Sequence, residues 1–221
     1  MPVNGGKARV RFLYNRLYKH YGPQRWWPAR TAWEMMVGAI LTQNTAWSNV
    51  EKAINALRGV RAHRSAPFPS VETIATMPRR RLEKLIRPSG YFRQKAERLQ
   101  RFARALLKDP SLPRRRERLL AQHGVGPETA DSIPLYAAHQ PVFVVDAYTR
   151  RIGRRMGLFN TDEYAEVQAF FQERLPREAA LYNEFHALIV RLAKEVCTKR
   201  DPTCAVCPVQ ADCAYALRGS R

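Results

Sequence analysis

The feature that most constrains this chain is a cluster of cysteines close to its C-terminus. All four cysteines of the 221-residue sequence fall within residues 197–213, in the spacing Cys197-x6-Cys204-x2-Cys207-x5-Cys213. Four soft thiolates in one short segment can surround a single metal centre, either an iron–sulfur cluster or zinc. A disulfide framework would spread its cysteines along a smaller secreted chain, so we interpret the segment as a metal-binding loop. The spacing alone leaves cluster and zinc open, although zinc ribbons usually have two short cysteine pairs and this loop has one.

The charge balance indicates a polyanionic partner. Lys and Arg number 38 against 19 Asp and Glu, which gives a formal net charge of +19. Nucleic acid is the common partner of so basic a domain. No run approaches the ~20 apolar residues of a membrane span, and the N-terminal residues have no apolar signal-peptide core. We therefore expect a cytoplasmic protein, associated with the nucleoid in a prokaryote. In this reducing compartment its thiolates remain free to bind metal. We also expect the protein to be a monomer.

The apolar pattern is helical throughout, which predicts an all-α fold. Apolar residues recur at helical spacing in most segments, and Pro and Gly mark the turns between them. Only residues 141–145, PVFVV, have the composition of a strand, and a run of this length can equally be a buried connection. The longer helices are expected over residues 8–20, 31–42, 48–57, 92–107, 114–122, 127–138, 147–156, 163–174 and 178–196.

Residues 119–130 predict a helix, a glycine turn and a second helix. Gly124 and Gly126 flank Val125, and two glycines let the backbone turn tightly with its N–H groups exposed. Those N–H groups and the following helix N-terminus can bind an anion, and Pro127 suits the first helical position. In so basic a chain the expected anion is a DNA phosphate, contacted without reading sequence. The alternative is an ordinary corner between two helices.

Three motifs in this order resemble the endonuclease III branch of the helix-hairpin-helix DNA glycosylases. They are GVGPETA at residues 124–130, PVFVVDAYTRR at residues 141–151, and the cysteine pattern. The resemblance implies a [4Fe-4S] cluster held by the four cysteines. It also implies two helical lobes, a six-helix barrel of residues 25–136 with the hairpin at its end, and a cluster lobe of residues 1–24 and 137–221. The hairpin residues expected to contact DNA are Gly124, Val125, Gly126 and Thr129.

Asp146 follows the apolar run and precedes a helix, so its chemistry alone makes it an N-cap. The family places its catalytic aspartate after such a run, here twenty residues past Gly126, and the resemblance therefore implies that Asp146 is catalytic. A glycosylase breaks a C1′–N bond through an oxocarbenium-like state, which a nearby carboxylate stabilises. The same carboxylate can orient or deprotonate the attacking water.

The hairpin lacks the lysine of the strand-cleaving members of this family. They carry it two positions after the second glycine, where its amine forms a Schiff base with the sugar. Here that position is Glu128, and a carboxylate cannot form an imine. The resemblance therefore implies a monofunctional enzyme that uses water. Glu128 is then either a polar residue of the base pocket or an exposed first-turn acid favoured by the helix dipole.

Trp26, Trp27 and Trp47 are candidates for the wall of a pocket that receives the flipped base. Aromatic faces stack on bases, and better still on cationic ones. Together with LTQNTAW at residues 41–47, the tandem tryptophan resembles the 3-methyladenine glycosylase subgroup, which implies an alkylated purine as the substrate. That subgroup's pattern does not include the cluster cysteines, so the chain combines features of two subgroups.

Gln43 or Asn44 is the candidate for the polar wedge that fills the gap left by the flipped base, and the alternative for either is a cap of the next helix.

Three functions compete. The first is a monofunctional glycosylase acting in base excision repair on double-stranded DNA with a damaged, alkylated purine. The second is an oxidised-pyrimidine glycosylase that also cleaves the strand, and Glu128 argues against it. The third is a non-enzymatic iron–sulfur DNA-binding protein, which Asp146 and the aromatic pocket argue against.

Overall fold

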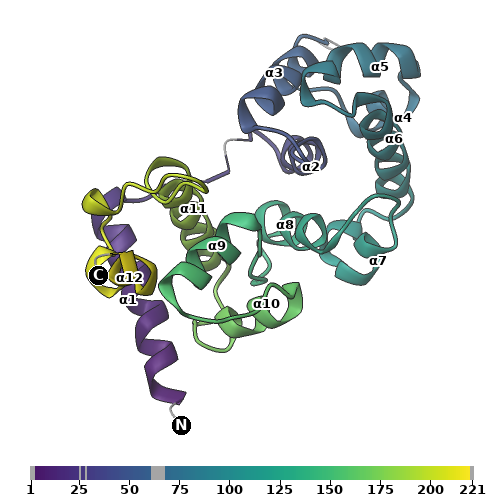
Figure 1. The fold of residues 1–221 in the computed structure, drawn as a ribbon. Helices are drawn as coiled ribbons and strands as arrows, with labels where there is room; N and C mark the ends of the chain where they lie inside the picture. The colour runs from purple at the N-terminus through teal and green to yellow at the C-terminus, as the bar shows by residue number, and fades with distance from the viewer. Residues whose placement is uncertain (1–2, 25, 28, 61–67, 220–221) are drawn as a thin grey trace. The chain divides into compact units, whose positions relative to one another are not determined.

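The computed structural model describes residues 3–24, 26–27, 29–60 and 68–219 (Figure 1). Every regular element in these ranges is a helix, and no strand occurs among them. The expectation of an all-α fold is therefore confirmed. The chain divides into two compact units: the terminal unit, Met1–Trp26 with Pro141–Arg221, and the central unit, Trp27–Gln140.

The central unit is built around one buried helix, α2. Thr31 is its N-cap, with a side-chain oxygen that accepts a hydrogen bond from the backbone N–H of Glu34. All residues from Glu34 to Leu41 are buried, and α2 packs against α3, α6 and α8. The helices of this unit are α2 (Ala32–Leu41), α3 (Trp47–Arg58), α4 (Val71–Thr76), α5 (Arg79–Ile86), α6 (Phe92–Lys108), α7 (Arg116–Leu120) and α8 (Pro127–Ala138), with 3-10 turns η1 (Arg87–Ser89) and η2 (Leu112–Arg114).

The terminal unit joins both ends of the chain around an aromatic core. The ring of Phe143 stacks on Phe171, with centroids 4.4 Å apart, and meets the edge of Tyr182 at 5.4 Å. Such pairs add to the free energy gained by burying the rings. The helices of this unit are α1 (Val3–Tyr21), α9 (Ala147–Met156), α10 (Tyr164–Gln172), α11 (Ala179–Glu195) and α12 (Ala214–Gly219), with 3-10 turns η3 (Cys204–Val206) and η4 (Gln210–Asp212).

Residues 141–145 are a buried connection and not a strand. Side chains of α10 satisfy the backbone groups that a neighbouring strand would otherwise bind. Gln172 accepts from the N–H of Phe143 at 3.0 Å, and Gln168 donates to the carbonyl of Phe143 at 2.7 Å. This pairing decides between the two interpretations that the sequence leaves open.

The helix expected over residues 114–122 is shorter than its pattern indicates. Two elements occupy the region, the 3-10 turn η2 and the helix α7. Arg115 lies between them with φ −117° and ψ 87°, outside the helical region, so the two do not join. Pro113 lies in the 3-10 turn, where its fixed φ is tolerated.

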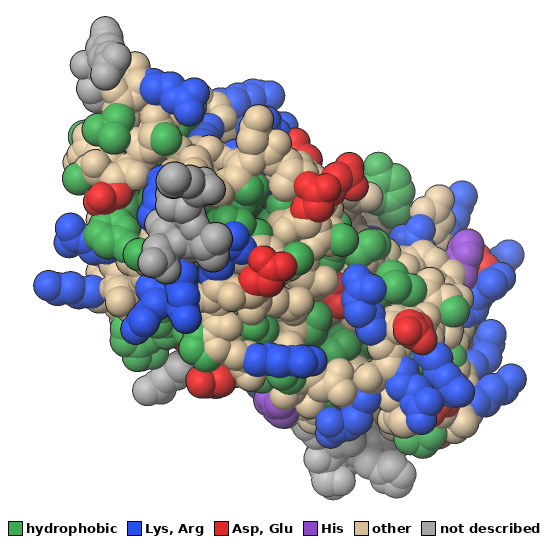
Figure 2. All heavy atoms as spheres, turned by 90° about the horizontal axis from the view of Figure 1, so that it is seen from below, with side chains coloured by type: hydrophobic (Ala, Val, Ile, Leu, Met, Phe, Trp, Pro, Cys, Tyr) green, Lys and Arg blue, Asp and Glu red, His purple; other side chains and the backbone are tan. Residues whose placement is uncertain are grey.

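The basic composition is visible on the molecular surface. On the face drawn in Figure 2, Lys and Arg side chains cover more area than the scattered Asp and Glu side chains. Among the described residues, no helix combines the length and the apolar character that crossing a bilayer requires.

Candidate functional site

Asp146 lies at the start of α9, where the buried connection of residues 141–145 ends. Its backbone is extended, with φ −107° and ψ −176°, and its Oδ1 accepts a 2.7 Å hydrogen bond from the backbone N–H of Thr149. Asp146 is therefore the N-cap of α9, as its place in the sequence indicates. The connection carries the side chain inward, so that only 8% of Asp146 is exposed.

His186 of α11 lies beside Asp146. Nε2 of His186 lies 3.4 Å from Oδ2 of Asp146, and 6% of the histidine is exposed. Burial raises the pKa of Asp146, but the charge and hydrogen bond of His186, with the hydrogen bonds of Thr149, outweigh it and hold that pKa below its ordinary value. The site thus holds a buried carboxylate that is ionised at neutral pH. The sequence gives no signal for His186, which lies 40 residues from Asp146 in an apolar helix.

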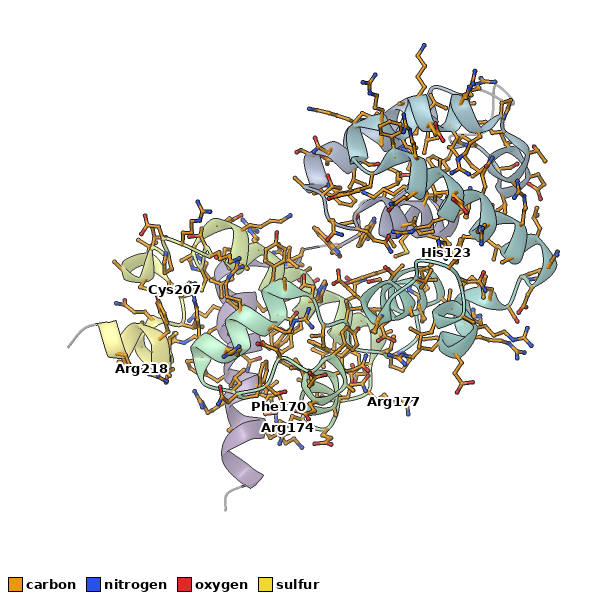
Figure 3. All side chains as sticks on the ribbon, turned by 45° about the vertical axis from the view of Figure 1, so that its right-hand side comes forward. His123, Phe170, Arg174, Arg177, Cys207 and Arg218 are labelled. Atoms are coloured by element: carbon orange, nitrogen blue, oxygen red, sulfur yellow. The ribbon has the colours of Figure 1, made fainter. Side chains whose placement is uncertain are left out.

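The expected hairpin turn lies between α7 and α8, and Figure 3 labels His123 within it. Gly124 has φ +77°, a left-handed conformation that favours glycine. Val125 is buried and anchors the turn. Gly126 is the N-cap of α8, and Pro127 occupies the first helical position. The start of α8 is exposed to solvent, where its N–H groups are available to an anion.

The two glycines of the hairpin differ in backbone conformation and in the space around them, although the sequence predicts the same role for both. Arg98 of α6 crosses over Gly124, so that a Cβ at this position would lie 2.1 Å from Nε of Arg98. Gly126 has φ −92°, and a Cβ there would meet no atom within 4 Å. The backbone conformation favours glycine at position 124, and a side chain there would also have to displace Arg98; neither condition applies at position 126.

We expect Gly124→Val to weaken binding to undamaged duplex DNA of any sequence by about tenfold or more, because the side chain strains the turn and displaces Arg98. Gly126→Ala is the matched control and should keep the wild-type thermal unfolding midpoint. Fluorescence anisotropy with two unrelated duplexes, alongside thermal unfolding, measures both effects. Wild-type affinity in Gly124→Val would show that this turn does not hold DNA.

Gln43 ties the turn between α2 and α3 to the hairpin. Its Nε2 donates to the carbonyl of Gly124 at 3.0 Å and to Oγ1 of Thr129 at 3.1 Å. Nη1 of Arg98 donates to its Oε1 at 2.7 Å. Both ends of the Gln43 amide are therefore engaged. Asn44 is exposed at the tip of the same turn with φ +52°, a conformation that asparagine tolerates.

A cavity of about 400 Å³ lies in the central unit, lined by residues of α2 and α3 and of the segment before α2. The rings of Trp27 and Trp47 meet edge to face within it, with centroids 5.1 Å apart. Trp27 also contacts Tyr136 of α8 at 5.2 Å. The edge-to-face contact leaves no room for a base between the two rings, so a base can stack only on an outer face. The lining residues are Trp27, Ala29, Glu34, Gly38, Trp47, Glu51, Ile54, Asn55 and Arg58.

Trp26 and Glu128 are not among the described residues that line this cavity. Trp26 belongs to the terminal unit, where Nζ of Lys194 lies 6.0 Å from its ring centre. Glu128 is exposed in the first turn of α8, which fits the second of its two interpretations. A role for either residue in the base pocket stays a prediction.

The four cysteines line one hollow in the terminal unit, and Figure 3 labels Cys207 in this loop. All four are free thiols. Arg155 also lines the hollow, with Nη1 3.1 Å from Sγ of Cys197 and 2.7 Å from the carbonyl of Thr198. Soft sulfur donors around one hollow fit a thiolate-held metal centre. In the described ranges, no three Cys, His, Asp or Glu side chains are placed to hold a single metal ion.

Comparison with known proteins gives the family. Residues 37–177 match the HhH-GPD superfamily of base excision DNA repair proteins, and the match includes the hairpin and Asp146. The chain belongs to this superfamily. The resemblance to helix-hairpin-helix glycosylases is thereby confirmed. The HhH-GPD match begins after Trp27 and ends before Cys197, so the tandem tryptophan and the cysteines lie outside it.

Similar proteins agree with the HhH-GPD assignment. A candidate DNA repair glycosylase of Methanocaldococcus jannaschii is 40% identical over 213 residues, 91% of this chain and 94% of that protein. The crystal structure of H. pylori 3-methyladenine DNA glycosylase bound to 1,N6-ethenoadenine is 31% identical with a TM-score of 0.75, and the match covers 86% of this chain and 97% of that one. A trapped endonuclease III–DNA covalent intermediate shares the fold, with a TM-score of 0.84 at 22% identity over 100% of both chains. The HhH-GPD chain is therefore a DNA glycosylase-type protein of base excision repair.

Proposed function

We propose that this HhH-GPD protein is a monofunctional DNA glycosylase that hydrolyses the N-glycosidic bond of an alkylated purine. The observation that carries the proposal is the buried carboxylate of Asp146, held ionised beside His186 at the N-terminus of α9. A fixed negative charge of this kind stabilises the positive charge that develops on the sugar as the bond breaks. The helix N-terminus further favours the ionised form.

Base release then needs only water as the nucleophile. The C1′–N bond breaks and its electron pair passes to the base, so that a cationic alkylated purine leaves as a neutral molecule. Water adds its oxygen to C1′ and loses a proton, which Asp146 can accept or direct. Glu128 stands where the strand-cleaving relatives carry an amine, and no imine can form on a carboxylate.

The cavity of the central unit supports a purine as the base. Its volume of about 400 Å³ suits a flipped purine, and Trp27 and Trp47 offer aromatic faces for stacking. The H. pylori relative is a 3-methyladenine DNA glycosylase whose structure holds 1,N6-ethenoadenine. Oxidised-pyrimidine excision with strand cleavage is the runner-up, supported by the endonuclease III fold and opposed by Glu128.

Asn44 is the better candidate for the wedge that fills the gap in the DNA. It is exposed at the tip of its turn, where its amide can enter the base stack. Gln43 would have to release Gly124, Thr129 and Arg98 before it could do so. We therefore propose that Gln43 holds the turn between α2 and α3 against the hairpin.

The test of the proposed function is a screen of the purified protein on duplexes that each carry one defined lesion. We expect release of N-alkylated purines, with an intact strand after mild work-up and cleavage only after alkali. Release confined to oxidised pyrimidines would establish the runner-up, and no release from any lesion would favour a non-enzymatic DNA-binding protein.

The cofactor that we propose is a [4Fe-4S] cluster. Cys197, Cys204, Cys207 and Cys213 would hold it, since they line one hollow and match the spacing of the endonuclease III branch. When bound, such a cluster is a one-electron redox centre. The chain's own residues already tie this loop to the fold, because Arg151 and Arg155 of α9 donate to backbone carbonyls between Ala193 and Lys199.

Protein purified without oxygen should be yellow-brown and contain about four irons and four acid-labile sulfides per chain. Cys213→Ser should lower the iron content, because it removes the most buried of the four thiols. Elemental analysis and absorption spectra measure both. One zinc per chain, with no iron or labile sulfide, would reject the cluster.

A further inference from the structure

Arg98 of α6 lies where the turn between α2 and α3 meets the hairpin. Its Nη1 donates to Oε1 of Gln43 at 2.7 Å. Its Nε lies against the backbone of Gly124, so closely that a Cβ there would be 2.1 Å away. This Nε is buried and has no hydrogen-bond partner among the described residues. Since a buried donor without an acceptor costs free energy, the placement of Arg98 points to a role other than stabilising the fold.

Arg98 sets the orientation of the Gln43 amide. A guanidinium has donors only, whereas an amide has one acceptor end and one donor end. Because Arg98 holds the oxygen of Gln43, the NH2 group faces the hairpin, where it donates to the carbonyl of Gly124 and to Oγ1 of Thr129. Without Arg98 the amide can turn around, and its oxygen would then face the Gly124 carbonyl. Two acceptors cannot bond each other, so the link to the hairpin would weaken.

Lys95 holds the start of the same turn. It precedes Arg98 by three residues and therefore lies on the same face of α6. Its Nζ donates at 2.8 Å to the carbonyl of Leu41, the last residue of α2. The turn is thus fixed to α6 at Leu41 and again at Gln43, and the exposed Asn44 follows directly. Lys95 is buried in the core, so Arg98 is the member of this pair that links the turn to the hairpin.

We propose that Arg98 is a positioning residue for base flipping, which acts through Gln43 to lock the turn that carries Asn44 to the hairpin. This inference rests on the proposed function, in which Asn44 fills the gap left by the flipped base. When the hairpin binds phosphate, the locked turn holds Asn44 at a fixed place along the same duplex. The wedge is then ordered before the base leaves the stack, and no further entropy is lost in ordering it. A loose turn leaves phosphate binding at the hairpin intact but stabilises the flipped state less.

The first test compares N7-methylguanine opposite cytosine with the same lesion opposite an abasic site, in single turnover with saturating protein. An unpaired base costs less to flip and depends less on a wedge. Arg98→Met keeps the length of the side chain and removes its donors. It should slow base release from the paired duplex by about tenfold and from the unpaired duplex by about twofold or less. Arg101→Met, which replaces an exposed arginine of the same helix paired with Glu97, should change neither rate. An equal loss on both duplexes overturns the proposal, because a merely destabilised fold has this effect.

A double-mutant cycle tests whether Arg98 acts through Gln43. Gln43→Met should slow release from the paired duplex to a similar extent. The double variant Arg98→Met/Gln43→Met should be no slower than the slower of the two single variants, because both remove the same link. Effects that multiply would show that Arg98 acts independently of Gln43, and they would overturn the proposal.

A flipping measurement without catalysis separates this inference from the proposed function. 2-Aminopurine placed next to the lesion fluoresces more strongly when the lesion leaves the stack, and Asp146→Asn protein should flip the base without releasing it. The fluorescence should rise with Asp146→Asn and should lose most of this rise when Arg98→Met is added. If wild-type protein releases no base but this difference is found, the glycosylase proposal fails and the role of Arg98 stands. If base is released but the rise is absent or does not depend on Arg98, the role of Arg98 fails alone.

Discussion

Asp146→Asn should lower the single-turnover rate of base release by about three orders of magnitude while leaving the affinity for lesion-bearing DNA within twofold of wild type. The substitution removes the charge that stabilises the oxocarbenium-like state and keeps the size of the side chain. Its amide oxygen can still accept from the N–H of Thr149, so the cap of α9 is retained. Quenched-flow excision assays and anisotropy binding curves measure the two effects.

Asp162→Asn is the control for this experiment. Asp162 is an exposed acid of the same unit whose partner is Arg154 at the surface, and its loss should not change excision. Near wild-type excision by Asp146→Asn would move the catalytic role to another residue. A large fall in the thermal unfolding midpoint would instead show that the contact between Asp146 and His186 is needed for folding. The excision rate would then be measured in His186→Gln, which retains a hydrogen-bonding side chain.

Borohydride reduction in the presence of a lesion-bearing duplex should give no covalent protein–DNA adduct in good yield. Trapping requires an amine that attacks the sugar carbon, and Glu128 occupies the position where the lyase relatives place theirs. Denaturing gel electrophoresis of the reduced mixture detects an adduct directly. A stable adduct in wild-type protein would contradict monofunctional chemistry.

Lys95 is an amine of the central unit with an altered acidity, because burial and the charge of Arg98 lower its pKa to about 8. A lowered pKa would make it nucleophilic, but its Nζ donates to the carbonyls of Leu41 and Ser89 and only 1% of the residue is exposed. It cannot reach a sugar without breaking these bonds. Glu128→Lys places an amine at the exposed start of α8 and should gain an adduct. Failure of Glu128→Lys to trap would mean that position 128 does not face the sugar.

Local chain geometry made several parts of the site predictable. A glycine turn and an N-cap depend on residues within three or four positions of each other, so the GVG hairpin and the capping role of Asp146 follow from the sequence. The same holds for the cysteine loop, whose four residues lie within residues 197–213, and for the all-α class, which apolar periodicity indicates. The family match spans two of these features, the hairpin and Asp146.

The tertiary structure decided what depends on contacts between distant segments. Residues 141–145 could be a strand by composition, but in the structure they are a connection, and side chains of α10 bind the backbone of Phe143. His186 reaches Asp146 because α11 packs against α9. Gln43 binds the hairpin across 81 residues, and Arg58 pairs with the buried carboxylate of Glu34 across 24 residues. The residues near each position specify the local backbone conformation, as in the glycine turn and the N-cap. Packing between distant segments determines which side chains contact each other, and these contacts set the charges and hydrogen bonds of the site.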